Sequence, residues 1–220
     1  MSEKKTKTLL ITDIEDISSF GTNLKSKYEI NEVYTIPTNT TLLFVIFFNI
    51  KESERCYKDL LLQNYKVHYT ISKYELPKDQ EKCEKGKNQS TVFITQKNRP
   101  INENEEIIKA VELCGEIRDI RDTNIYTKCF EYFDSRSADR CVKEFSTKKY
   151  KDMDVSVKYV WDMSTKTKWD IIRYTDNILS QQAVVQKRKV SSLKKNLFIN
   201  ILDEFISENI NEISKAIMRK

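Results

Sequence analysis

The sequence predicts an α+β protein with two tandem βαββαβ units and a helical, basic C-terminal arm. In the 220-residue chain, β-favouring runs and stretches with apolar residues at helical spacing alternate in the same order twice. Charged and polar residues with one proline and one glycine separate the two repeats. We therefore expect a first unit at residues 1–72, a linker at 73–90, a second unit at 91–162 and the arm at 163–220.

The first unit opens with a β-rich run and a stretch that has apolar residues at helical spacing from Ile17 to Leu24. Two further β-rich runs flank Pro37, as in an antiparallel hairpin. A second helical pattern and a closing strand follow. The expected strands are 8–12, 29–36, 41–48 and 65–71, and the expected second helix is 51–63.

The second unit repeats this order and also repeats part of the sequence. Residues 47–56 align with residues 132–141, and both segments carry an aromatic pair followed by acid-Arg-Cys at the same offset. This self-similarity indicates a duplication. The expected strands are 91–95, 116–121, 127–133 and 154–160, and the expected helices are 103–113 and 135–145.

Composition argues against several classes of function. Three glycines leave little material for a phosphate-binding loop or a dinucleotide fold. Five widely spaced cysteines without a CxxC pair indicate neither a disulfide framework nor a zinc site, and a single histidine gives little basis for a His-dependent triad. We therefore expect no enzyme, no cofactor and no metal. The absence of a signal-peptide core after the charged N-terminus predicts a cytoplasmic protein, with the nucleus as the alternative.

Two segments of the second unit carry a family resemblance. Residues 128–138 (KCFEYFDSRSA), preceded by residues 114–123 (CGEIRDIRDT), resemble the second RNA-recognition motif (RRM) of the Mei-two-like RNA-binding proteins. Residues 72–92 resemble the family's linker. The resemblance implies two tandem RRM-like folds of the ferredoxin-like βαββαβ type. The family has a third RRM, for which we expect no counterpart after Val160, because residues 161–220 show no β pattern.

An RRM binds single-stranded RNA by stacking bases on aromatic side chains of its two central strands, one on the first strand and two on the third. In the second unit Phe93 matches the first-strand ring, whereas the third-strand positions are Thr127 and Cys129. Packing within the sheet or an interface is an equally good interpretation of Phe93. Three basic residues are candidate phosphate contacts, with a solvated surface as the alternative: Arg118, Arg121 and Lys128.

The first unit has a more apolar set of residues at the same positions. These are Leu10, Leu42 and Phe44, so that Phe44 is its one candidate RNA-binding ring. Together with Ile46 they predict an apolar face, which we expect either another protein or the chain's own C-terminal helix to cover.

The C-terminal arm combines an amphipathic helix with a basic cluster. Apolar positions after Trp169 predict the helix: Ile171, Tyr174, Ile178 and Leu179. The basic cluster predicts contacts with RNA phosphates, with a solvated helix face or a nuclear localisation signal as the alternatives. Its candidate residues are Lys187, Arg188, Lys189, Lys194 and Lys195.

A net charge of +5 and the RRM resemblance predict a non-catalytic RNA-binding protein that docks on structured RNA in a ribonucleoprotein. The favoured setting is the ribosome, with ribosomal RNA and ribosomal proteins as partners and a role as a dormancy factor that keeps the particle idle. One alternative is a regulator that binds single-stranded mRNA, and another is a protein-interaction scaffold. We expect neither membrane nor DNA partners.

Overall fold

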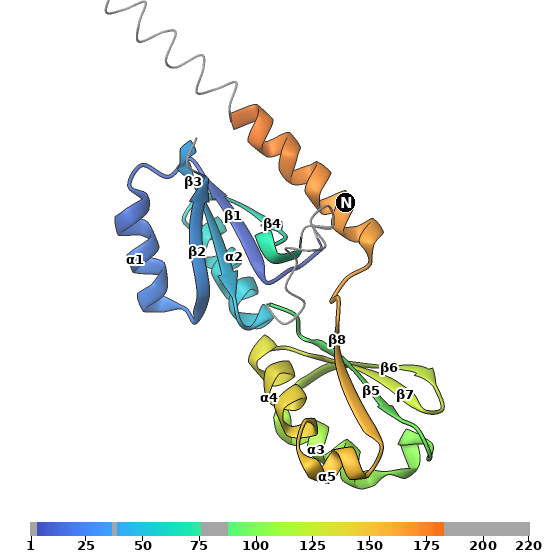
Figure 1. Cartoon of the computed structure of the whole chain (residues 1–220). Helices are drawn as coiled ribbons and strands as arrows, with labels where there is room; N and C mark the ends of the chain where they lie inside the picture. Colours follow the sequence, from blue (N-terminus) through green and yellow to red (C-terminus); the bar gives the residue numbers. More distant parts are fainter. Residues whose placement is uncertain (1–3, 37–38, 76–87, 183–220) are drawn as a thin grey trace, which may run out of the picture. The chain divides into compact units, whose positions relative to one another are not determined.

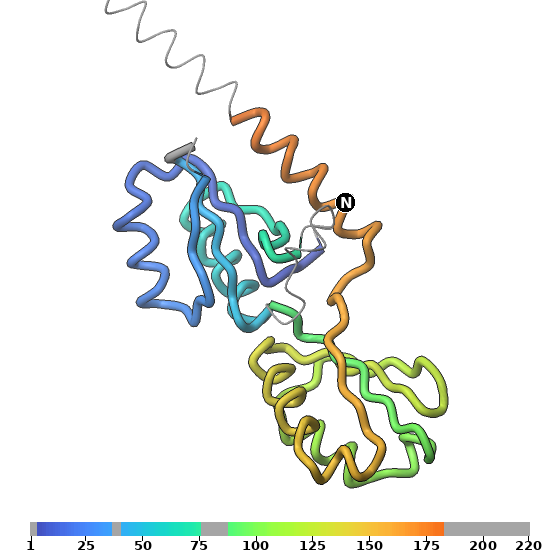
Figure 2. The backbone as a smooth tube through the Cα atoms, in the orientation of Figure 1, coloured from blue at the N-terminus to red at the C-terminus, as the bar shows by residue number. Residues whose placement is uncertain are grey.

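A computed structural model describes residues 4–36, 39–75 and 88–182 of the chain. The chain divides into two units, Met1–Ile172 and Arg173–Lys220. The first unit holds both βαββαβ repeats, and their backbones can be followed in Figures 1 and 2.

The first repeat forms a four-stranded antiparallel sheet with strand order β2-β3-β1-β4 (Figure 1). Successive side chains of each strand point to opposite faces of the sheet. On one face, Leu9 and Val45 lie in a core with Leu60 of the second helix. The elements are β1 (Thr8–Thr12), α1 (Ile17–Lys27), β2 (Ile30–Ile36), β3 (Asn39–Phe47), α2 (Ile50–Leu62) and β4 (Lys66–Thr70).

The second repeat forms an equivalent antiparallel sheet with strand order β6-β7-β5-β8 and its own core, which includes Val92 and Phe130. The elements are β5 (Thr91–Gln96), α3 (Glu105–Cys114), β6 (Ile117–Asn124), β7 (Thr127–Tyr132), α4 (Ser135–Phe145), α5 (Lys148–Asp152) and β8 (Val155–Val160). The predicted α+β fold with two βαββαβ repeats is therefore confirmed.

Helix α5 is absent from the sequence prediction. Its five residues are charged except for Tyr150, so they show no apolar periodicity. Tyr150 is buried and packs on Phe145, with 4.4 Å between the ring centroids. One aromatic contact thus anchors a turn that local sequence did not reveal.

The duplicated segments of the two repeats contact each other at equivalent positions. Asn49 and Asp134 form an isolated β-bridge. The backbone N–H of Ile50 donates to the carbonyl of Phe133 at 3.0 Å, and the N–H of Ser135 donates to the carbonyl of Phe48 at 2.9 Å. Since residues 48 and 50 align with residues 133 and 135, this contact is self-complementary, as in a twofold-symmetric dimer.

Side chains repeat the same symmetry. Lys51 lies over the ring of Phe133, 4.0 Å from its centroid, and pairs with Glu116 at 2.6 Å. At the aligned positions, the guanidinium of Arg136 lies over the ring of Phe48 at 4.6 Å. Arg136 also pairs with Glu29 at 2.5 Å. Each repeat therefore supplies a cation that stacks on an aromatic ring of the other repeat and pairs with its carboxylate.

The ends of the expected linker are structured. Residues Lys73–Glu75 form a short 3-10 turn, η1, directly after β4. The carboxylate of Glu75 is buried and accepts hydrogen bonds from the backbone and hydroxyl of Ser72 and from Asn88. Polar composition alone therefore did not distinguish linker from a buried polar network at these positions.

A helix follows the second sheet at residues 165–182. None of the helices in the described part of the chain is long and apolar enough to cross a membrane.

Candidate nucleic-acid interface

The second sheet carries one aromatic ring between two cations on the face turned away from its helices. Register places four residues in a row across β6, β7, β5 and β8: Arg121, Cys129, Phe93 and Lys158. Their neighbours along the strands, such as Val92 and Phe130, point into the core. Because side chains alternate between the two faces of a strand, the row lies on the face opposite the helices.

Exposure within this row differs from residue to residue. Phe93 is partly exposed, and Arg121 and Lys158 are exposed, whereas Cys129 is buried. We call this face of the second sheet, centred on Phe93, the open face. A partly exposed ring flanked by positive side chains can stack on a base and meet the adjoining phosphates.

A carboxylate lies beside the row and binds two arginines. Glu131 accepts from Arg118 at 2.8 Å through one oxygen and from Arg121 at 3.3 Å through the other. Its side chain is only 13% exposed. Burial raises the pKa of the Glu131 carboxyl above its ordinary value, while Arg118 and Arg121 oppose that rise.

Lys128 does not belong to the open face. It pairs across the strands with Ile94, a core residue, and so points to the side of the sheet that bears the helices. There its ammonium forms an ion pair with Asp122 at 3.2 Å. Strand alternation thus separates Lys128 from Phe93, although both were grouped as candidates from the sequence.

The first sheet has a different set of residues at the equivalent row: Tyr34, Phe44, Leu10 and His68. Leu10 is 0% exposed and Phe44 is 6% exposed. The rings of Tyr34 and Phe44 stack on each other, 4.9 Å apart and 6° from parallel. Phe44 is therefore occupied by an internal contact, and no face of its ring is offered to a base in this structure.

The η1 turn covers part of this first face. Lys73 lies 4.7 Å from the centroid of the Tyr34 ring and pairs with Glu32, which also accepts from the Tyr74 hydroxyl at 2.7 Å. Burial strongly raises the pKa of the Tyr34 phenol. The apolar residues expected on this face, which include Leu42 and Ile46, are buried, as anticipated from their composition.

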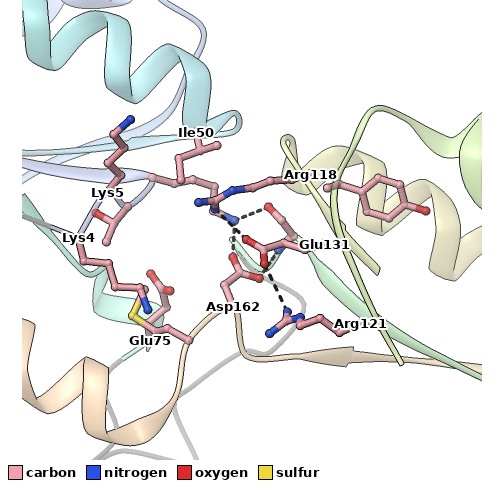
Figure 3. Close-up of a pocket in the computed structure, with 13 residues that line it drawn as sticks. Lys4, Lys5, Ile50, Glu75, Arg118, Arg121, Glu131 and Asp162 are labelled. Atoms are coloured by element: carbon pink, nitrogen blue, oxygen red, sulfur yellow. Dashed lines mark hydrogen bonds and ion pairs between the residues drawn. The ribbon is translucent and has the colours of Figure 1, made fainter. Parts of the chain in front are cut away.

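A pocket of about 390 Å³ adjoins the open face (Figure 3). In Figure 3, Arg118 and Arg121 converge on Glu131 at one side of the pocket. The pocket has five basic and three acidic residues, of which the remaining ones are Lys4, Lys5, Lys7, Glu75 and Asp162.

Lys7 and Asp162 form a buried ion pair at 2.8 Å, with side chains that are 6% and 12% exposed. Asp162 also accepts from the backbone of Ser90 and the hydroxyl of Thr91, both at 2.8 Å. Lys7 precedes β1 and Asp162 follows β8, so this pair joins the start of the first repeat to the end of the second.

Sequence reasoning missed three residues of this region, namely Lys158, Glu131 and Lys7. Lys158 lies two positions before the end of β8, where it pairs with Phe93. The alternation of β8 was a signal from which the face of Lys158 could have been predicted. No local pattern marks Glu131 or Lys7, because their partners lie elsewhere in the chain.

The five basic candidates at residues 187–195 lie outside the described residues. The helix predicted after Trp169 is present within residues 165–182; Ile171 is buried and Ile178 and Leu179 are half-buried, whereas Tyr174 is 43% exposed. The buried positions are Lys168, Ile171 and Thr175, and Tyr174 lies about 100° around the helix from Thr175. Within the described ranges, no cluster of three His, Cys, Asp or Glu side chains could hold a metal ion.

The strand order and connectivity define two tandem RRM-like folds. No protein-family model matches the sequence, and a search of curated proteins gave no match. Similar solved structures include RNA recognition domains 1 and 2 of Sex-lethal from Drosophila melanogaster (15% identity, 70% of this chain and 100% of that chain, TM-score 0.26).

Two further structures are similar at the same level. They are the C. elegans NONO-1 homodimer (9% identity, 99% of each chain, TM-score 0.29) and the three N-terminal RNA binding domains of the yeast splicing factor Prp24 (13% identity, 74% of this chain and 70% of that chain, TM-score 0.26). With TM-scores this low, the fold assignment rests on the strand order of each sheet.

Proposed function

We propose that this chain is a non-catalytic RNA-binding protein and that it binds an unpaired stretch of RNA on the open face of the second sheet. The observation that carries the proposal is the row in which Phe93 lies between Cys129 and Lys158, with Arg121 beyond Cys129. Stacking of a base on an aromatic side chain contributes about 1–3 kcal/mol and tolerates any base. Lysine and arginine add salt-sensitive attraction to phosphates.

The two repeats have different roles in this proposal. The second sheet presents its ring to solvent, whereas the first sheet uses the equivalent positions for internal packing. A single ring supports modest affinity with little sequence preference. The first repeat then acts as a structural support that positions Lys4–Lys7 near the open face.

The direct test is fluorescence anisotropy with a short single-stranded RNA at low salt. Phe93→Ala should weaken binding by about 1–3 kcal/mol, or roughly five- to 150-fold. Phe20→Ala is the matched control, because it removes the same ring from a partly buried site on α1, where Phe20 packs on Tyr65. Equal affinities of wild type and Phe93→Ala would rule out the proposed surface.

We further propose the ribosome as the setting, with ribosomal RNA loops as the unpaired target and a dormancy role in the cytoplasm. The support is compositional: the basic cluster at residues 187–195 suits an abundant structured RNA. Tagged protein should cosediment with ribosomes at low salt and leave them at high salt. Recovery only in ribosome-free fractions at low salt would exclude this setting.

The second candidate is a single-stranded mRNA regulator of the Mei-two-like kind, which the partly exposed Phe93 favours. Crosslinking the protein to RNA in cells and sequencing the attached fragments separates the two, since ribosomal fragments support the first and mRNA fragments the second. Failure to recover any RNA would instead favour a protein scaffold.

A further inference from the structure

The pair of arginines beside the open face is held by a carboxylate in a way that resembles phosphate recognition. Glu131 gives one oxygen to Arg118 at 2.8 Å and the other to Arg121 at 3.3 Å. Guanidinium groups bind carboxylates and phosphates through the same fork of N–H donors. A phosphate placed between these two arginines would meet the donors that Glu131 now uses.

The location suits the backbone of an RNA whose base stacks on Phe93. Glu131 is two residues from Cys129 on the same face of β7, and Cys129 lies directly opposite Phe93. Two residues along a strand span about 6.6 Å. The arginine pair therefore lies within one nucleotide's reach of the stacking ring.

Burial weakens the hold of the Glu131 carboxylate on the two arginines. Its side chain is mostly withdrawn from water, which disfavours its charged form and raises the pKa of its carboxyl. The two arginine side chains are about half exposed or less, at 38% and 50%, so a ligand from solvent has access to them. Displacement would release the Glu131 carboxylate toward the pocket.

The residues that line the pocket carry a net positive charge, which also favours a phosphate ligand. The five basic and three acidic lining residues leave an excess of two positive charges. Lys7 forms an ion pair with Asp162 and Lys5 forms one with Glu54, both at 2.8 Å. Glu131 is the carboxylate shared by Arg118 and Arg121, and Arg121 also pairs with the half-exposed Asp119 at 3.3 Å.

We propose that Arg118 and Arg121 form a binding site for a nucleotide phosphate and that Glu131 occupies this site when RNA is absent. The phosphate replaces the carboxylate when RNA binds, so Glu131 limits affinity for RNA. This inference rests on the proposed function and names the phosphate contact within it. The phosphate comes either from within an RNA strand or from its 5′ end, and the two sources share the same chemistry.

The test compares two charge-matched variants of the full chain by anisotropy with a single-stranded RNA. Glu131→Gln removes the competing carboxylate and should tighten binding about three- to tenfold at low salt, with a steeper salt dependence. Glu105→Gln removes the same charge from an exposed residue of α3, where it pairs with Lys109, and should change affinity less than twofold. Adding Arg121→Gln to Glu131→Gln should abolish the gain.

The phosphate source follows from two versions of the same RNA. If the 5′ end fills the site, Glu131→Gln should favour the 5′-phosphorylated strand over the 5′-hydroxyl strand, whereas an internal phosphate gives equal gains. Equal affinities of Glu131→Gln and Glu105→Gln for both strands would overturn the inference. In that case, loss of binding in Phe93→Ala would leave the proposed function intact, whereas absence of wild-type binding would remove the proposed function itself.

Discussion

The two sheets share strand order and connectivity but differ in the row of residues across their centre. The first sheet has Tyr34, Phe44, Leu10 and His68, and the second has Arg121, Cys129, Phe93 and Lys158. The first row is largely buried and apolar. The second row is charged at both ends and leaves its ring partly exposed.

Two repeats of one fold can thus differ in the chemistry of one sheet face through a few positions. The first five residues of β5 (TVFIT) are identical to β1 (TLLIT) at three positions, and the central leucine or phenylalanine is the position that faces away from the helices. The proposed RNA binding therefore depends on the residues of the face and not on the topology, because one fold can carry unrelated functions.

The central positions of the two sheets should differ strongly in their contribution to stability. Leu10→Ala should lower the free energy of unfolding by about 2–5 kcal/mol, because Leu10 is fully buried. Phe93→Ala should lower it by less than about 1 kcal/mol, because its ring is partly exposed. Urea denaturation followed by circular dichroism measures both. Equal losses would mean that the second face is also packed.

A second aromatic ring on the open face should increase the difference between the two sheets in RNA binding. Cys129→Phe places an aromatic side chain beside Phe93 and should tighten binding of single-stranded RNA by about 1 kcal/mol, or roughly fivefold. Because Cys129 is buried, the larger side chain should also lower the free energy of unfolding by about 1–3 kcal/mol. Cys129→Ser serves as the control and should leave affinity unchanged. Weaker binding by Cys129→Phe at a temperature where circular dichroism shows the variant to be folded would argue against stacking at this face.

A smaller effect concerns the contact at which the repeats are alike. Arg136→Ala and Lys51→Ala should each lower the free energy of unfolding by about 1 kcal/mol, since each removes one cation–π contact and one ion pair. Lys109→Ala, which breaks an exposed ion pair within α3, should cost only about 0.3 kcal/mol. Similar values for all three variants would show that the symmetric contact adds nothing.

The smallest effect is a difference in pH dependence between two carboxylates. At Asp134 burial acts to raise the pKa, but hydrogen bonds from Arg136 outweigh it and lower the pKa below the ordinary value. Asp134 therefore stabilises the fold at neutral pH and loses that contribution as pH falls through its lowered pKa. Asp134→Asn should reduce the free energy of unfolding at pH 7 and make it fall less steeply as the pH is lowered.

The pKa of Glu131 is shifted in the opposite direction to that of Asp134. Its raised pKa means that the folded protein takes up a proton more readily, so its charge is unfavourable at neutral pH and the cost disappears in acid. Glu131→Gln should therefore be neutral or slightly stabilising at pH 7. Thermal melts from pH 3 to 7 compare the two variants, and a marked loss of stability in Glu131→Gln at pH 7 would contradict this assignment.

Much of the fold could be predicted from the sequence, because alternation in strands and helical spacing are local signals. They gave the element order, the face that carries Phe93 and the polar positions Thr127 and Cys129. Lys128 was grouped with Arg118 and Arg121 as a candidate phosphate contact without a face being assigned to it, and its register with Ile94 places it on the side of the sheet that bears the helices. The short helix α5 and the exposed side of Tyr174 depend on single tertiary contacts or on the rotation of a helix, and local patterns carry little of either.

The candidate site was harder to predict than the fold. Glu131, Lys7 and Asp162 draw their roles from partners that are distant in sequence, since Lys7 pairs with a residue 155 positions away. Spacing rules cannot identify such pairs. The covering of the first sheet by Lys73 and Tyr74 likewise depends on how the chain turns after β4.

We propose that RNA binds the second sheet and not the first. This can be measured from the backbone amide shifts of isotope-labelled protein, followed by NMR during titration with a short single-stranded RNA. We expect the shifts to concentrate in β5, β7 and β8 around Phe93, while β1 and β3 around Leu10 and Phe44 stay unchanged. Shifts confined to β1 and β3 would contradict it.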